Sequence, residues 1–188
     1  MKRALCMLAL AASTSVTTSA LAQGYVGIVG GMTKQDVNCS NWAKCDRSDT
    51  GFKLYGGYQF SKLASVELGY TDFGSVSLAT ANNVATGSYS ASAISLGGAL
   101  HLPLAPKFTG IVRLGMASVD ADYSYAGPFG LFAASSSESS IEPYVGFSLA
   151  YALTPQLSLT GSFDYLRADY PRGSGSATLL GLGLRYAF

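Results

Sequence analysis

The sequence predicts an all-β fold, an eight-stranded antiparallel up-and-down transmembrane β-barrel, and three observations support this prediction. The chain of 188 residues is apolar overall, with a mean hydropathy of +0.26 and only 12% charged residues, against about 25% in ordinary soluble proteins. After residue 22, no segment supplies the roughly 18 consecutive apolar residues of a membrane-spanning helix. Instead, segments of about ten residues alternate apolar residues with polar or small ones, which is typical of membrane-spanning barrel strands.

The first 22 residues have the organisation of a cleavable signal peptide. Met1-Lys2-Arg3 is a short basic region, residues 4–12 are apolar and uncharged, and Ala20-Leu21-Ala22 matches a cleavage site. A membrane-anchor helix is the alternative, but the apolar run is shorter than the roughly 20 residues that a helix needs to cross a bilayer. We therefore predict a signal peptide over residues 1–22 and an exported barrel domain over residues 23–188.

Eight segments carry the strand pattern, and connections rich in Gly, Ser, Asn, Asp and Pro separate them. They are residues 24–34, 50–60, 63–74, 88–102, 107–119, 141–152, 156–167 and 177–188. Successive side chains of a strand point to opposite faces, so each face can be read by parity. One face of the last segment, for example, carries Leu180, Leu182, Leu184, Tyr186 and Phe188.

Charged residues lie on the opposite face from the large apolar residues of their own strands. A basic residue that faced lipid near the bilayer midplane would cost about 2–4 kcal/mol, so we assign the charged face to the lumen. The interior of an eight-stranded barrel is just wide enough to be filled by side chains. We therefore expect a lumen charge network of Lys53, Glu67, Arg113, Glu142, Asp164 and Arg185. For Glu67 to face inward while Phe60 faces outward, the turn at Ser61-Lys62 needs a three-residue loop or a bulge.

The connections between the segments alternate in length. Residues 61–62, 103–106 and 153–155 form short connections, whereas 35–49, 75–87, 120–140 and 168–176 form long ones. In bacterial barrels the short turns face the periplasm and the long loops face outside, so both termini of the barrel are expected to be periplasmic. A soluble lipocalin-like barrel is the alternative, but it would place its apolar residues inside.

Cys39 and Cys45 lie in a polar segment of the exported part of the chain. In an exported protein such a pair predicts a disulfide. A metal site is the alternative, but it would need further ligands, and the single histidine, His101, lies far along the chain. We expect no metal and no cofactor. The net charge of +1 gives no electrostatic reason to bind nucleic acid.

Three stretches resemble the first three strands of the OmpA-like transmembrane domain. They are Tyr25-Val26-Gly27, residues 50–60 (TGFKLYGGYQF) and residues 66–70 (VELGY). The resemblance implies an eight-stranded barrel of the bacterial outer membrane with a plugged, polar interior. No residues follow the last predicted strand, so we expect a stand-alone barrel without the peptidoglycan-binding domain of the full-length family members.

The C-terminal residues 183–188 (GLRYAF) resemble the terminal signal by which outer-membrane proteins are recognised for assembly. The residues that carry this likeness are Gly183, Tyr186 and Phe188. An ordinary strand that ends on Phe is the alternative. The implied partners during biogenesis are periplasmic chaperones and the barrel-assembly machinery.

Three classes of function are compatible with these features. The favoured one is a structural, monomeric outer-membrane barrel, in contact with outer-membrane lipid and lipopolysaccharide, whose loops are available for adhesion to an unknown surface ligand. The alternative is a narrow ion or small-solute pore gated by the lumen charge network. We expect no catalysis, because the usual kind of base occurs only as His101, which has no evident partner. Aromatic residues of the 120–140 loop form either a contact patch or part of the interfacial girdle: Tyr123, Tyr125, Phe129 and Phe132.

Overall fold

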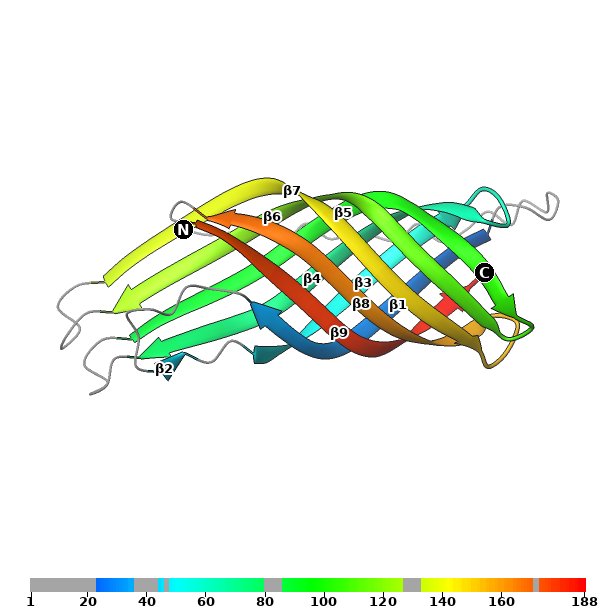
Figure 1. Ribbon diagram of the computed structural model, residues 1–188, viewed down its shortest axis with the longest axis horizontal. Coiled ribbons are helices and arrows are strands. Elements are labelled where there is room, and N and C mark those ends of the chain that lie inside the picture. The colour runs from blue at the N-terminus through cyan, green and yellow to red at the C-terminus, as the bar shows by residue number, and fades with distance from the viewer. Residues whose placement is uncertain (1–22, 36–43, 46–47, 80–85, 127–132, 171–172) are drawn as a thin grey trace.

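The computed structural model describes residues 23–35, 44–45, 48–79, 86–126, 133–170 and 173–188. They form β1 (Gln23–Gln35), β2 (Lys44–Cys45), β3 (Ser48–Gln59), β4 (Ala64–Ala79), β5 (Thr86–Ala105), β6 (Phe108–Ala126), β7 (Ala133–Ala152), β8 (Leu157–Tyr170) and β9 (Gly173–Ala187). Eight of these strands pair antiparallel in the order β1-β3-β4-β5-β6-β7-β8-β9, and β9 returns to β1, so the barrel is closed (Figure 1). The predicted eight-stranded up-and-down barrel is confirmed. The two-residue β2, which pairs with β4, is an addition to it.

Among the described residues, no helix is long and apolar enough to cross a membrane.

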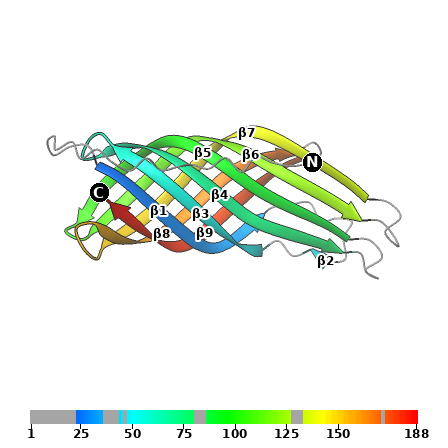
Figure 2. The same cartoon turned by 180° about the vertical axis from the view of Figure 1, so that it is seen from behind.

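The two ends of the barrel differ in their connections. At one end, here called the turn end, residues 60–63, 106–107 and 153–156 join successive strands, and β1 begins and β9 ends there (Figures 1 and 2). The other end, here called the loop end, carries the remaining connections. By the rule that short turns face the periplasm in bacterial barrels, the loop end is the end that the sequence analysis predicts to lie outside.

The strands run further toward the loop end than the sequence predicted. Pairing between β4 and β5 continues to Ala79 and Thr86, and pairing between β6 and β7 continues to Ala126 and Ala133. The loops predicted over residues 75–87, 120–140 and 168–176 are therefore mostly strand, and the 35–49 connection is interrupted by β2 and the start of β3. These extensions are rich in Ser, Ala and Gly, so they lack the apolar alternation by which lipid-facing strands are recognised.

The two faces of the wall follow the predicted parity. Large apolar side chains that face outward are exposed, as shown by Leu180 and Leu182 at 65% and 68%, whereas the intervening inward positions are covered. Turn length sets the faces of β4: four residues separate Gln59 from Ala64, so Glu67 faces the lumen and Phe60 faces outward. The need for more than a two-residue turn is confirmed.

A β-bulge at Gly74 shapes the loop end of β4. Gly74 has a φ of 72°, and the register with β5 shifts between Asp72 and Ser75. The Asp49 carboxylate holds the bulge by accepting hydrogen bonds from the backbone N–H of Ser75 (2.7 Å) and of Thr50 (2.8 Å). Asp49 lies beyond the apolar band of the wall, and these two N–H groups hold the pKa of its carboxyl below the ordinary value.

Candidate functional site

A buried ion pair occupies the middle of the lumen. The Lys53 ammonium on β3 donates a hydrogen bond to Asp164 Oδ1 on β8 at 2.8 Å, and both side chains are only 1% exposed. Tyr144 on β7 completes the group, because its hydroxyl accepts from Lys53 at 2.5 Å and donates to the same carboxylate. Ser162 donates to the other oxygen, Asp164 Oδ2, at 2.8 Å. The Asp164 carboxylate thus has three donors from three strands.

A second ion pair lies beside the first. Arg113 Nε on β6 donates to Glu67 Oε1 on β4 at 2.6 Å, and the same oxygen lies 4.0 Å from Lys53 Nζ. Arg113 also donates through a terminal nitrogen to Ser148, which donates to Ser162 at 2.9 Å. Four of the six predicted lumen charges are therefore brought together in one connected group.

The other two predicted lumen charges have different surroundings. Arg185 makes no ion pair within the described part of the chain, and its guanidinium carbon lies 3.9 Å from the centroid of the Tyr25 ring instead. Such a cation–π contact replaces the expected carboxylate partner. Glu142 is 8% exposed, and no described residue forms an ion pair with it.

A hydrogen-bonded chain at the turn end was missed by the sequence interpretation. His101 Nε2 lies 2.8 Å from Ser65 Oγ, Ser65 Oγ lies 2.9 Å from the Tyr25 hydroxyl, and Tyr25 donates to Glu67 Oε2 at 3.0 Å. The expectation that His101 has no partner is wrong. Its partner lies on the neighbouring strand, and the register between β4 and β5 is not readable from either segment alone. Ser65 and His101 are 2% and 3% exposed, so this pair is closed to solvent.

Apolar side chains fill the lumen on the loop-end side of the ion pairs. This loop-end cluster consists of Phe73, Ala91, Ala93, Ala117, Val119, Tyr144, Leu166, Ala177 and Leu179, all at most 6% exposed. A smaller apolar group of Ala99, Ile111 and Ala150 lies toward the turn end. The lumen is therefore polar in the charged layer and mostly apolar on its loop-end side, where Thr33 and Gln35 are also buried. Close apolar packing thus covers the charged layer on its loop-end side.

The predicted assembly signal lies at the seam where β9 meets β1. A Cβ at Gly183 would fall 1.9 Å from the Ile28 carbonyl oxygen, so only glycine fits this close approach. Tyr186 and Phe188 face outward, with ring centroids 5.7 Å apart. The Phe188 N–H donates to the Gly24 carbonyl at 2.9 Å, which ties the end of the chain to β1. Recognition of these residues by the assembly machinery stays a prediction.

Several other predicted features lie outside what the structure describes. Tyr123 and Tyr125 belong to β6 rather than to a loop, but only their backbone is described, and Phe129 and Phe132 fall outside the described residues. The predicted signal peptide over residues 1–22 and the side chains of Cys39 and Cys45 also lie outside what the structure describes. Within the described ranges, no group of three His, Cys, Asp or Glu residues could hold a metal ion.

Comparison with known proteins identifies the family. Residues 20–188 match the model of the OmpA-like transmembrane domain. No curated protein matches the chain significantly. Among solved structures, it resembles Neisserial surface protein A (TM-score 0.65, 16% identity, covering 88% of this chain and 97% of that one).

Two further structures have the same fold. One is a major outer-membrane protein of Thermus thermophilus, with a TM-score of 0.63 and 15% identity, covering 90% of this chain and all of that one. The other is Ail, the attachment invasion locus protein of Yersinia pestis, with a TM-score of 0.54 and 19% identity, covering 87% of this chain and 99% of that one. With the closed barrel and the family match over nearly its whole length, the chain belongs to the OmpA-like transmembrane domain family of bacterial outer-membrane barrels.

Proposed function

We propose that this protein is a non-conducting structural barrel of the outer membrane that holds its loop end outside for interaction with other surfaces. The observation that carries the proposal is the filled lumen. Lys53 and Asp164 are each 1% exposed, and Phe73 and Leu179, in the apolar cluster toward the loop end, are 1% and 0% exposed. A barrel of this width has no room for a water column beside such side chains.

The layering of the lumen supports a closed barrel more strongly than the ion pairs alone. An ion that entered from the turn end would have to separate charged partners and then cross the loop-end cluster. The buried polar side chains at this level, Thr33 and Gln35, already donate to the Phe73 carbonyl, so the packing offers little to replace the ion's hydration shell. An uncompensated charge in such surroundings is very unfavourable. The charged layer is accordingly interpreted as a structural core, and catalysis is not part of the proposal.

The shape of the loop end supports the second half of the proposal. β5, β6 and β7 contain 20, 19 and 20 residues, against 13 in β1 and 12 in β3. Together with the end of β4, their ends project on the left of Figure 1 beyond β1, β8 and β9. A paired hairpin presents a fixed surface at little conformational cost on binding. Ail, which has the same fold, is named for attachment, and an adhesive role of this kind is what we propose for the projecting hairpin of β6 and β7.

Planar-bilayer recording of the purified, refolded protein tests the closed lumen. The wild-type barrel should give no conductance events above background. A Phe73→Ser/Leu179→Ser variant, which places hydroxyls in the loop-end cluster, should give brief openings and so serves as the positive control. Regular wild-type openings would overturn the proposal.

A gated pore is the second candidate, and one observation favours it. Glu67 Oε1 lies 2.6 Å from Arg113 and 4.0 Å from Lys53, so a short side-chain movement would exchange its partners. In a gate, wild-type protein would conduct and Glu67→Gln would change the open fraction. In the closed barrel, neither protein conducts.

Shortening the β6–β7 hairpin tests the proposed surface role. In this variant residues 123–136 are removed, and an Asn-Gly turn joins Asp122 to Ser137, which are register partners. The change leaves the strand pairs between this position and the turn end in place. Different migration on SDS gels with and without boiling would show that the variant is folded. Cells that display it should bind epithelial monolayers less than cells with the full barrel. Equal binding would refute the adhesive role and leave the structural role standing.

A further inference from the structure

The outward-facing charges at the loop end are distributed unequally around the barrel. Lys34 on β1 and Arg167 on β8 are exposed and flank β9, where their register partners are Thr178 and Ser176. The opposite wall is centred on β5, because β5 and β9 are four strands apart in the ring of eight. There, Asp72 on β4 and Asp120 on β6 are both register partners of Ser92. Asp122, the next outward residue of β6, is exposed as well. Among the side chains that the structure describes, one wall thus carries two cations where the other carries three carboxylates.

Two apolar grooves cross the outer face of the barrel between these two walls. The first groove, of about 740 Å³, crosses β5 to β9, with Gly110 and Gly161 in its lining and Leu104, Phe147, Phe163 and Leu180 around them. The second groove, of about 750 Å³, crosses β9, β1, β3, β4 and β5 on the other side and includes Ile28, Leu54, Tyr70, Ile94 and Leu184. The residues that line each groove are register partners on successive strands. Because the strands are tilted, each groove runs obliquely from the turn end toward the loop end.

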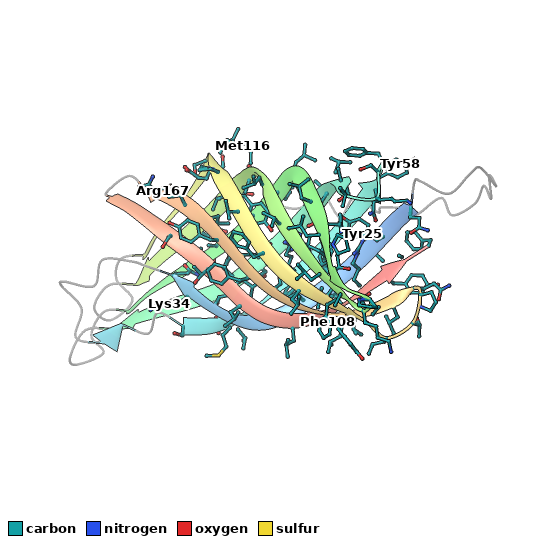
Figure 3. The ribbon with its side chains drawn as sticks, turned by 45° about the vertical axis from the view of Figure 1, so that its right-hand side comes forward. Tyr25, Lys34, Tyr58, Phe108, Met116 and Arg167 are labelled. Atoms are coloured by element: carbon teal, nitrogen blue, oxygen red, sulfur yellow. The ribbon has the colours of Figure 1, made fainter. Side chains whose placement is uncertain are left out.

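Where the two grooves come nearest to the loop end, they lie next to charges of opposite sign. The first groove ends at Leu180, and the next outward position on β9 is Thr178, whose hydroxyl donates to the backbone carbonyl of Lys34 at 3.2 Å. Arg167 is one outward position further toward the loop end. Figure 3 shows Lys34 and Arg167 at this end of the barrel, and neither makes an ion pair within the described part of the chain. The second groove ends at Tyr70 and Ile94, and the next outward position on β4 toward the loop end is Asp72.

We propose that the first groove binds one phosphorylated lipid of the outer leaflet, the lipid A part of lipopolysaccharide, with an acyl chain along Gly161 and a phosphate between Lys34 and Arg167. Long basic side chains at the edge of an apolar band extend their charged ends toward the headgroup layer. The guanidinium can bind two phosphate oxygens at once, and the ammonium adds a second charge. The carboxylates above the second groove repel the same ligand. The site lies on the wall of the barrel and is independent of what the loop end binds.

Native mass spectrometry of the refolded barrel in neutral detergent, titrated with bis-phosphorylated lipid A, tests the cation pair. Lys34→Gln/Arg167→Gln should weaken binding about 30-fold, because each cation near an anionic lipid surface contributes roughly a fivefold gain. The matched control is Lys62→Gln/Lys107→Gln, which removes two exposed lysines at the turn end and should leave binding unchanged. Dephosphorylated lipid A should bind the wild-type barrel as weakly as the phosphorylated lipid binds the Lys34/Arg167 variant.

The groove is tested with two outward glycines that both accept a side chain. A Cβ at Gly161 would lie 3.7 Å from Leu182, and one at Gly98 on the β5 wall would lie 3.9 Å from the Ser65 carbonyl, so neither substitution should strain the backbone. Gly161→Leu fills the first groove and should weaken lipid A binding at least several-fold, whereas Gly98→Leu should not. Heat-modifiable migration on gels would confirm that each variant is folded. Equal affinities in the two glycine variants, or no effect of the Lys34/Arg167 change, would overturn the proposal.

Discussion

The pair of Lys53 and Asp164 offers a quantitative test of the interior. Asp164→Asn leaves the Lys53 ammonium buried, with the Glu67 carboxylate oxygen at 4.0 Å as its nearest remaining anion. Removing one partner of a buried ion pair typically lowers the free energy of unfolding by about 3–5 kcal/mol. We expect about 4 kcal/mol here, because both members are 1% exposed.

The reverse change should be milder. Lys53→Met leaves the Asp164 carboxylate with two other donors, Tyr144 and Ser162, so we expect a loss of about 3 kcal/mol. In the double variant Lys53→Met/Asp164→Asn no unpaired charge remains at this position. Its total loss should be about 3–4 kcal/mol, well short of the roughly 7 kcal/mol that the single changes would give if they were additive.

The measurement is reversible urea unfolding in phospholipid vesicles, followed by the far-ultraviolet circular dichroism of the strands. Lys62→Met, an exposed lysine at the turn end, is the control for Lys53→Met and should change stability by less than about 0.5 kcal/mol. A double variant whose loss equals the sum of the single losses within about 0.5 kcal/mol would show that the two residues are uncoupled. That result would refute the interpretation of the charged layer as a core.

Three further outcomes follow from individual contacts. Glu142→Gln should leave the free energy of unfolding unchanged or raise it, because no described residue pairs with this buried carboxylate; a loss above about 1 kcal/mol would contradict this. Gly74→Ala should destabilise the barrel by about 1–3 kcal/mol, since φ is 72° and a Cβ would lie 2.7 Å from the Thr50 carbonyl oxygen; an unchanged urea midpoint would argue against the bulge. The lowered pKa of Asp49 means that its hydrogen bonds stabilise the bulge above about pH 4 and are lost as the pH falls through the folded value. NMR should then show a lower protection factor of the Ser75 amide against solvent exchange at low pH, and Asp49→Asn should abolish this dependence.

The sequence predicted the parts of the barrel where successive residues alternate between apolar side chains that face lipid and polar or small side chains that face the lumen. Between Leu179 and Leu180, however, parity alone separates a buried leucine from an exposed one, with exposures of 0% and 65%. An apolar residue on the inward face leaves the outward alternation intact, so the alternation does not reveal the loop-end cluster. Phe73 follows the same inward parity as Glu67 and Thr71, and the bulge at Gly74 changes the register only after it.

Contacts between strands were beyond the reach of the sequence for a different reason. The bonds of Ser65 with His101 and with Tyr25 depend on the register of three strands. A shift by one residue would move each of these side chains to the other face. Arg185 shows the same limit: its parity was correct, but its partner is the ring of Tyr25 on the adjacent strand β1 and not a carboxylate. The alternation along each strand predicts which side chains face the lumen, whereas the register between strands decides which of them are in contact.

The order of layers along the lumen connects stability with function. Ion pairs exposed to water contribute little to stability, and a charged layer open at both ends would be hydrated and leaky. In this barrel the loop-end cluster removes water from one side of the layer, so separating Lys53 from Asp164 exposes each charge to an apolar environment. The same packing that makes the ion pairs strong also blocks the passage of ions. A barrel stabilised from within in this way does not depend on the projecting ends of β6 and β7 for its stability, so the residues of these ends are free to serve recognition.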